Sequence, residues 1–214
     1  MSDPRVTAMP VVDCGERLVS LADTPQLLLD RRLADPAGAF SYVREELVGR
    51  LLAAQNLLPA GLRLLIIEGY RPPELQVRYF DEYSAELRAA NPGWSDEHLH
   101  VQTSRSLAPP AIAPHTCGAA VDLTLCTEAG DELPMGTEVN TSPEQNAGAC
   151  FTDAPNISAL ARSHRSLLSA VMTSAGFVNY VTEWWHWSYG DRYWAVATGA
   201  PAARYGLITE PPRQ

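Results

Sequence analysis

Residues 114–125, Pro-His-Thr-Cys-Gly-Ala-Ala-Val-Asp-Leu-Thr-Leu, pass from a proline-rich loop into an apolar run. From Ala119 to Leu125 the residues are small, apolar or β-branched, which predicts a short buried strand interrupted only by Asp122. Burying a carboxylate is costly unless it is hydrogen-bonded, paired with a cation or bound to a metal. Asp122 therefore needs a partner, and His115 is the nearest candidate in the sequence.

A second polar cluster lies near the far end of the chain, where Glu183 and His186 stand among tryptophans at positions 184, 185 and 187. Taken singly, Asp122 is most simply a strand-end cap and His115 a surface histidine. Two clusters of ionisable residues among bulky apolar ones, in one chain, favour a functional role for these residues. His115, Asp122 and His186 form a set of two histidines and one carboxylate, which suits Zn²⁺ with an open fourth position for water.

The 214 residues include 46% hydrophobic residues, 16 basic and 25 acidic residues, and carry a net charge of −9. This predicts a single domain over residues 1–214, with flexible ends at 1–10 and 208–214. An acidic chain without basic runs is a poor candidate for binding nucleic acid or an anionic membrane. No run has the length of a membrane span, and residues 1–10 lack the apolar core of a signal peptide, so the expected location is the cytoplasm. A homo-oligomer is compatible with this composition.

Hydrophobic periodicity and the positions of proline and glycine predict helices over residues 37–58, 73–90, 156–174 and 190–199, and strands over 62–68, 119–125 and 177–187. Asn156 is the expected cap of the third helix. The long insert 126–156 has the length of a functional lid or binding loop. Glu183 and His186 are three residues apart, so they can serve one site only if a bulge or sharp turn lies between them.

Arg71 follows the predicted strand 62–68, in the turn Gly69-Tyr70-Arg71-Pro72-Pro73. From the end of a strand, a guanidinium can reach into a cleft. A surface salt bridge to Glu68 or Glu74, worth about 0–1 kcal/mol, is equally consistent with the sequence.

Three motifs occur in order along the chain: Glu68-Gly69-Tyr70-Arg71-Pro72, His115-x-x-Gly118-x-Ala120-x-Asp122 and Glu183-Trp184-Trp185-His186. With Met135-Gly136-Thr137 in the insert, they make the sequence resemble the D-alanyl-D-alanine dipeptidase family of zinc peptidases, over roughly residues 10–190. The resemblance implies a small α+β domain with a mostly antiparallel sheet flanked by helices. It also implies that His115, Asp122 and His186 ligate Zn²⁺, that Glu183 is the general base, and that Arg71 stabilises the transition state.

The chemistry of the residues agrees with that implication. Zinc held by three protein ligands lowers the pKa of its bound water to about 7 and polarises a carbonyl. Glu183 would move the proton from this water to the leaving amine, and the indoles around it favour a raised pKa.

Two positions differ from the family pattern. Ala113 stands where the family usually has a serine, and Asn140 where it typically has an aspartate that holds the amine of the substrate. A neutral amide holds an ammonium group more weakly than a carboxylate does. With Tyr70, these are the expected substrate-binding positions. The expected substrate is D-Ala-D-Ala or a related D-configured dipeptide or amide, with an amino end that differs from that of free D-Ala-D-Ala.

Other functions fit parts of the same pattern. An amide hydrolase that tailors a specialised metabolite fits the altered positions as well as cell-wall dipeptide turnover does. Two histidines and a carboxylate also hold Fe(II) in oxygenases, and a zinc-binding module without turnover would keep the metal alone. Neither of these last two needs Glu183 beside His186 together with Arg71.

Overall fold

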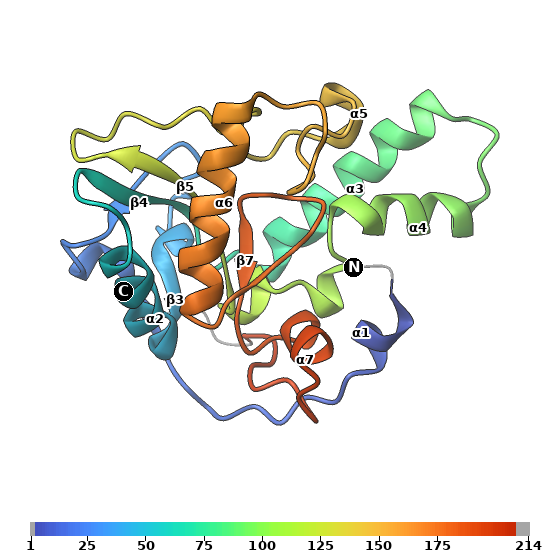
Figure 1. Cartoon of the computed structure of the whole chain (residues 1–214). Helices are drawn as coiled ribbons and strands as arrows, with labels where there is room; N and C mark the ends of the chain where they lie inside the picture. Colours follow the sequence, from blue (N-terminus) through green and yellow to red (C-terminus); the bar gives the residue numbers. More distant parts are fainter. Residues whose placement is uncertain (1–2, 209–214) are drawn as a thin grey trace.

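A five-stranded sheet runs through the middle of the computed structural model, which describes residues 3–208 (Figure 1). Helices and short strands surround the sheet, so the α+β class expected from the sequence is confirmed. In chain order the elements are α1 (Pro4–Ala8), β1 (Leu18–Ser20), η1 (Leu21–Asp23), β2 (Leu28–Leu29), η2 (Ala39–Ser41), β3 (Tyr42–Arg44), α2 (Glu45–Asn56), β4 (Leu62–Glu68), α3 (Pro73–Ala90), α4 (Asp96–Ser106), η3 (Pro110–Ile112), η4 (His115–Cys117), β5 (Ala120–Thr127), α5 (Pro143–Asn146), α6 (Ala159–Ser174), β6 (Val178–Asn179), β7 (His186–Ser188) and α7 (Arg192–Thr198).

The strand order of the sheet is β2-β4-β5-β7-β6. Strand β2 pairs with β4 in parallel, and the other three pairings are antiparallel. The sheet is therefore mostly antiparallel, as predicted. Strands β1 and β3 form a separate antiparallel ribbon.

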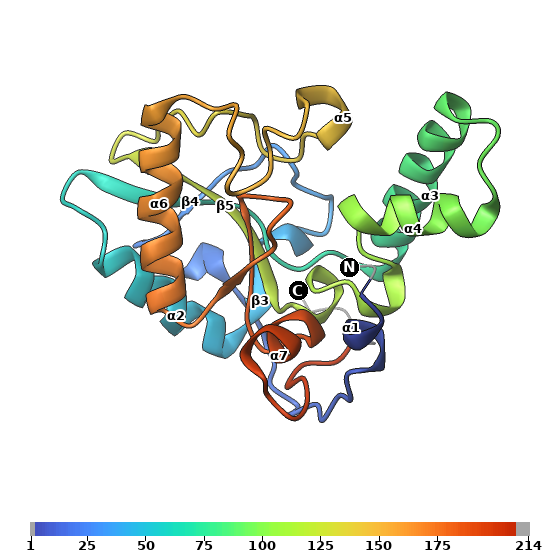
Figure 2. The ribbon, with the colours of Figure 1, turned by 45° about the vertical axis from the view of Figure 1, so that its right-hand side comes forward.

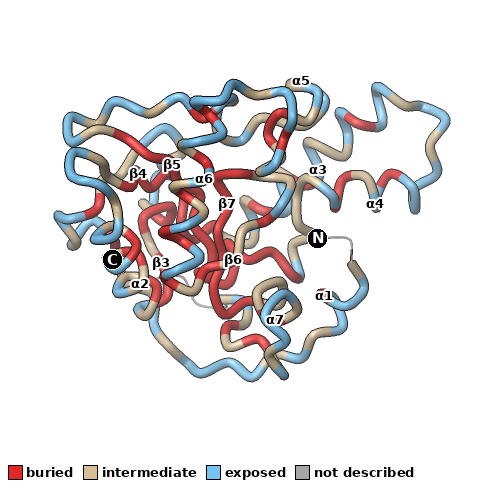
Figure 3. Tube along the Cα trace, in the orientation of Figure 1, coloured by how far each residue is buried: buried red, intermediate tan, exposed pale blue. Residues whose placement is uncertain are grey.

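Successive side chains of β5 point alternately to the hydrophobic core and to the polar face of the sheet. Val121, Leu123 and Leu125 lie in the main core, together with Leu51 of α2 and Leu168 of α6. Helices α2 and α6 contact each other and lie on this side of the sheet (Figure 1), and the buried trace is concentrated here (Figure 3). Because successive side chains of a strand point to opposite faces, Asp122 is directed away from this core.

The helices α3 and α4 pack together and project from the body of the molecule, on the side away from α2 and α6 (Figure 2). The segment between them, residues 91–95, is mostly exposed. The predicted span of α3, residues 73–90, agrees with the structure, as does the strand 62–68.

The helix predicted over residues 37–58 begins later, at Glu45. Residues 39–44 instead form η2 and β3, and Val43 pairs with Val19 of β1. Phe40 and Val43 are buried here without being helical, so their apolar spacing did not distinguish a helix from a strand.

The cap expected at Asn156 is also wrong. The Ser158 hydroxyl accepts a hydrogen bond from the Ala161 N–H at 3.1 Å and caps α6, whereas the Asn156 amide donates to the Ala147 carbonyl.

The ends of the chain were expected to be flexible. Residues 4–8 form α1, which packs against α7 and buries Val6. The Ile208 N–H donates to the Thr116 carbonyl, and the rest of the predicted flexible tail lies outside the described residues. Among the helices of residues 3–208, none has both the length and the apolar character that crossing a bilayer requires.

Candidate active site

Register across three neighbouring strands brings polar groups together on the face of the sheet opposite the core. Asp122 of β5 pairs with Glu68 of β4 on one side and with His186 of β7 on the other. A register shift between Ile66 and Glu68 brings Glu68 opposite Asp122. Glu68 and His186, which are 54 and 64 positions from Asp122 in the sequence, therefore lie beside it in the sheet.

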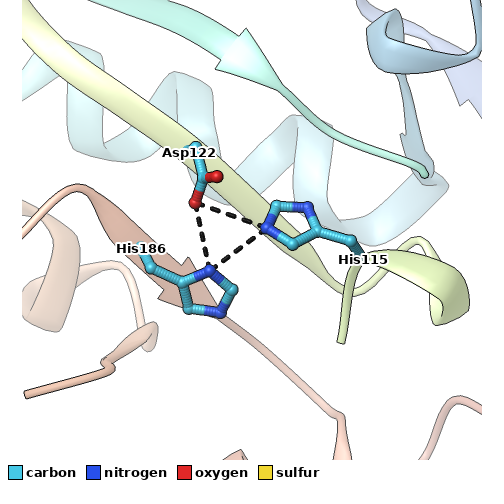
Figure 4. Close-up of side chains that lie close together, drawn as sticks. All are labelled: His115, Asp122 and His186. Atoms are coloured by element: carbon cyan, nitrogen blue, oxygen red, sulfur yellow. Dashed lines mark hydrogen bonds and ion pairs between the residues drawn. The ribbon is translucent and has the colours of Figure 1, made fainter. Parts of the chain in front are cut away.

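His115 completes the predicted metal-binding set from η4, just before β5 (Figure 4). Its Nε2 atom is 3.3 Å from Asp122 Oδ1 and 3.1 Å from His186 Nδ1. His186 Nδ1 is 3.0 Å from the same carboxylate oxygen. The three side chains are buried, and their ligand atoms face one another.

Hydrogen bonding decides which ring nitrogen of His115 carries the proton. Nδ1 lies 2.7 Å from the Gly69 carbonyl, an acceptor, so Nδ1 is the protonated nitrogen and Nε2 offers its lone pair to the site. In turn the Arg71 N–H donates to the His115 carbonyl at 3.2 Å. The first two sequence motifs are therefore joined directly through their backbones.

The turn that follows His115 requires a glycine at position 118. Gly118 has φ +65°, and a Cβ there would lie 2.3 Å from Leu18 Cδ2. Its N–H donates to the His115 carbonyl and closes η4. The tight turn positions His115 immediately before β5.

Burial alone would raise the pKa of Asp122, but the two imidazoles outweigh it and hold the pKa of this carboxyl well below its usual range. Burial would likewise lower the pKa of His115, and the charge of Asp122 outweighs it, so that pKa is raised. Three electron-rich atoms that converge in this way attract a cation. Among the described residues, the group offers three protein ligands, as in a catalytic zinc site with an open position.

Glu183 lies in a turn between β6 and β7, which resolves the problem of its spacing from His186. The Glu183 N–H donates to the Tyr180 carbonyl, and the His186 N–H donates to the Glu183 carbonyl. The Asn179 amide donates to the carbonyls of both Glu183 and His186, each at 3.0 Å. The expected turn is present, and Asn179, which the sequence analysis did not single out, holds it.

The carboxylate of Glu183 faces the same site. Its Oε2 atom lies 3.9 Å from His186 Nδ1, and 19% of its side chain is exposed. Burial raises the pKa of Glu183 to about 7. Asp122 differs from Glu183, because the imidazoles of His115 and His186 hold its pKa below the usual range.

Arg71 is both buried and paired, which combines the two interpretations left open by the sequence. Its Nε donates to Glu68 Oε1 at 2.8 Å, its Nη2 donates to Glu68 Oε2, and its Nη1 donates to Gln76 Oε1 at 2.7 Å. The salt bridge is thus not at the surface. Arg71 lines a cleft of about 330 Å³ beside the predicted metal ligands.

The cleft lies between α3 and the insert. Its α3 side includes Gln76, Tyr79, Glu82, Tyr83 and Glu86, and its insert side is formed by residues 140–143. Asn140 and Ala113 line the cleft, as expected of substrate-binding positions. Tyr70 does not: it is 2% exposed, and its N–H donates to the Tyr42 carbonyl. The backbone pairing with residue 42 directs this residue into the protein, a contact that the sequence does not reveal.

Comparisons with known proteins identify the family of the chain. A model of the family described as D-ala-D-ala dipeptidase (Peptidase_M15) matches residues 29–200. A D-alanyl-D-alanine dipeptidase of Synechocystis sp. is 30% identical over 222 residues, covering 88% of this chain and 87% of the relative. One from Enterococcus faecium is 30% identical over 161 residues, covering 70% and 77% of the two chains.

Solved structures with similarity include VanYB in complex with D-alanine-D-alanine, at TM-score 0.46 and 18% identity, covering 77% of this chain and 81% of that one. The LD-carboxypeptidase LdcB has a TM-score of 0.49 and 18% identity, covering 90% and 76%. The family assignment depends on the sequence matches, which span most of the chain. The chain belongs to the D-ala-D-ala dipeptidase family of metallopeptidases.

Proposed function

We propose that this chain hydrolyses a small D-configured dipeptide, D-alanyl-D-alanine or a close relative, with Zn²⁺ held by His115, Asp122 and His186. The observation that carries the proposal is the convergence of two imidazole nitrogens and a carboxylate oxygen beside a carboxyl whose pKa is about 7. Nitrogen and oxygen ligands of this kind suit zinc, and three of them leave a position for water. When bound there, zinc polarises the scissile carbonyl and acidifies the water.

Glu183 is the general base in this proposal. Its Oε2 atom accepts a proton from the attacking water and passes it to the nitrogen of the leaving amine. A pKa of about 7 suits both halves of this transfer, because the carboxylate is then basic enough to accept the proton and the carboxyl acidic enough to donate it.

Arg71 meets the negative charge that develops on the carbonyl oxygen. Glu68 and Gln76 engage three of its five N–H groups in the described chain, which leaves one on each Nη for the substrate. Because the guanidinium is already fixed, it needs no reorganisation as the charge develops.

The amino end of the substrate is expected to differ from that of free D-Ala-D-Ala. Gln76 and Glu86 both line the cleft, and at 1.5 Å per residue they are roughly 15 Å apart along α3. An extended dipeptide spans only about 7 Å. With neutral Asn140 in the wall, the cleft accommodates an N-substituted or longer substrate. This supports, as a second candidate, an amide hydrolase that tailors a specialised metabolite.

A binding module without turnover and an Fe(II) oxygenase are less consistent with the site. Neither requires a carboxyl with a raised pKa and a fixed arginine in one cleft. The cytoplasmic location, the lack of nucleic-acid and membrane partners and a homo-oligomeric state remain predictions from the sequence.

The test is hydrolysis by the zinc-loaded protein of D-Ala-D-Ala, L-Ala-L-Ala and N-acetyl-D-Ala-D-Ala, followed as released alanine, with Glu183→Ala as the control. Release from a D-configured substrate that depends on Glu183 supports the peptidase. A clear preference for free D-Ala-D-Ala over the acetylated form would refute the proposed difference at the amino end. No release from any substrate, with stoichiometric zinc bound, would refute dipeptide hydrolysis.

A further inference from the structure

Gln76 lies on the first turn of α3 and is 1% exposed. Its Oε1 atom accepts a hydrogen bond from Arg71 Nη1 at 2.7 Å, and its Nε2 atom donates to the Ala108 carbonyl at 2.8 Å. A guanidinium can only donate and a carbonyl can only accept, so these two partners fix the orientation of the amide. Both ends of the Gln76 amide are thus hydrogen-bonded, and the residue is buried.

The guanidinium of Arg71 is held on several sides. The Glu68 carboxylate accepts hydrogen bonds from Nε and Nη2, and the Gln76 side-chain oxygen accepts one from Nη1. The ring of Tyr79, one turn further along α3, lies 5.2 Å from Arg71 Cζ, within cation–π range. Removal of Glu68 would leave the arginine charge without its counter-charge, whereas removal of Gln76 changes geometry without changing charge.

Gln76 also connects Arg71 to the segment that leads to the first predicted metal ligand. Ala108, which accepts from Gln76, precedes η3 and the proline segment that ends at His115. His115 itself accepts from the Arg71 N–H. The arginine and the histidine are therefore joined by two routes, one through the backbone and one through the Gln76 amide.

We propose that Gln76 is a positioning residue, which orients the Arg71 guanidinium toward the reacting carbonyl and holds it at a fixed place relative to His115. This rests on the role proposed above for Arg71. Orientation matters in the transition state, where the charge on the oxygen develops, more than in the ground state. Loss of Gln76 therefore lowers kcat and leaves KM nearly unchanged.

Three variants test the effect on zinc-dependent hydrolysis of the best substrate in the dipeptide series. Gln76→Met keeps the length of the side chain and removes both hydrogen bonds, so kcat falls about 10- to 100-fold, as small misplacements in an active site do. Gln76→Glu keeps the acceptor for Arg71 and recovers a substantial part of that loss. Phe80→Leu removes buried apolar contacts from the same helix without touching Arg71, and keeps kcat within about twofold. A Gln76→Met enzyme with wild-type kcat, or equal losses in Phe80→Leu, would overturn the proposal.

A double-mutant cycle separates positioning from a general structural role. Arg71→Lys keeps a positive charge beside Glu68 but lacks the planar fork. Because Gln76 acts through that fork, Gln76→Met lowers kcat less than about twofold in the Arg71→Lys background. The same fold-loss in both backgrounds would mean that Gln76 acts only through the fold.

A spectroscopic measurement is independent of turnover. The Nη1–H resonances of Arg71, assigned by their loss in Arg71→Lys, exchange slowly with solvent, and in Gln76→Met the exchange of the proton that Gln76 binds is at least several-fold faster. Unchanged exchange would overturn the proposal. If the wild type binds zinc but hydrolyses nothing, the proposed function fails while this measurement still decides whether Gln76 holds Arg71.

Discussion

At the scale of single residues, three carboxyl groups at one end of the sheet are placed in three different environments. Glu68 is paired with the Arg71 fork. Asp122 is held by two imidazoles, so its pKa stays well below the usual range. Glu183 lacks a partner of comparable strength, and burial raises its pKa to about 7. The pKa values of Asp122 and Glu183 are driven apart in this way, and such carboxyl groups take different chemical roles.

The environment of Glu183 predicts the acid limb of the pH profile, the range in which activity falls as the pH decreases. The base must be deprotonated, so activity falls about tenfold per pH unit below the pKa of Glu183. That pKa is about 7 without a metal, and a bound cation lowers it. We therefore expect kcat/KM to decline with an apparent pKa at or below about 7. Glu183→Gln lowers kcat about 10²- to 10⁴-fold, and its residual rate, measured between pH 5 and 9, has no such limb. A limb that persists in this variant would belong to another group.

Asn140 offers a test of how the amino end of the substrate is held. Its φ is +62°, a conformation that aspartate adopts almost as readily as asparagine, so Asn140→Asp adds a charge without new backbone strain. The variant lowers KM for a dipeptide with a free ammonium group roughly tenfold, or about 1.4 kcal/mol. KM for the N-acetyl analogue, the matched control, does not fall. Equal changes for the two substrates would place Asn140 away from the amino end.

At the scale of elements, prediction succeeded where one signal was long and unambiguous. A proline in the first turn, between turns at 69–73 and 91–93, located α3, and a mostly apolar run located β4. Prediction failed where local signals compete. Phe40 and Val43 fit a helical spacing but lie in η2 and β3, because pairing with β1 is a contact between segments distant in sequence. Long-range pairing also explains why Tyr70 points away from the cleft.

The turn from residue 180 to residue 186 shows how one side chain can hold an element. Asn179 donates to two carbonyls inside the turn, so Asn179→Ala leaves both without this donor. We expect the free energy of unfolding to fall by about 1–3 kcal/mol. We also expect kcat to fall, because Glu183 and His186 both belong to the turn.

Urea unfolding and steady-state kinetics measure the two effects of Asn179→Ala. Thr152→Val is the matched control, since it removes only the hydroxyl that bonds to Asn179 Oδ1. An Asn179→Ala protein with unchanged kcat would show that the turn keeps its geometry without the amide.

At the scale of the whole molecule, segments near both ends of the described chain are hydrogen-bonded, directly or through Arg44, to the loop that carries His115. Arg44 donates to the Cys117 carbonyl at 2.9 Å and to Asp13 Oδ2 and the Gly206 carbonyl, each at 3.0 Å. The Ile208 N–H donates to the Thr116 carbonyl. Sequence motifs predicted the group of His115, Asp122 and His186 because its residue types and order are distinctive. They could not reveal these hydrogen bonds of Arg44, because a buried arginine bound to backbone carbonyls has no sequence pattern to recognise.

Since the three predicted ligands come from η4, β5 and β7, a metal bound to them cross-links segments 71 residues apart in the chain. Such a ligand binds the folded state only, and at a free concentration 100 times its Kd it adds about 2.7 kcal/mol to the free energy of unfolding. For a chain of this size we expect Tm to rise by about 5–10 °C with zinc and to return after chelation. Asp122→Asn removes the shift, and His98→Gln, at an exposed histidine of α4, keeps it. A full shift in Asp122→Asn would place the metal at another site, because this variant loses the one carboxylate ligand that both imidazoles face.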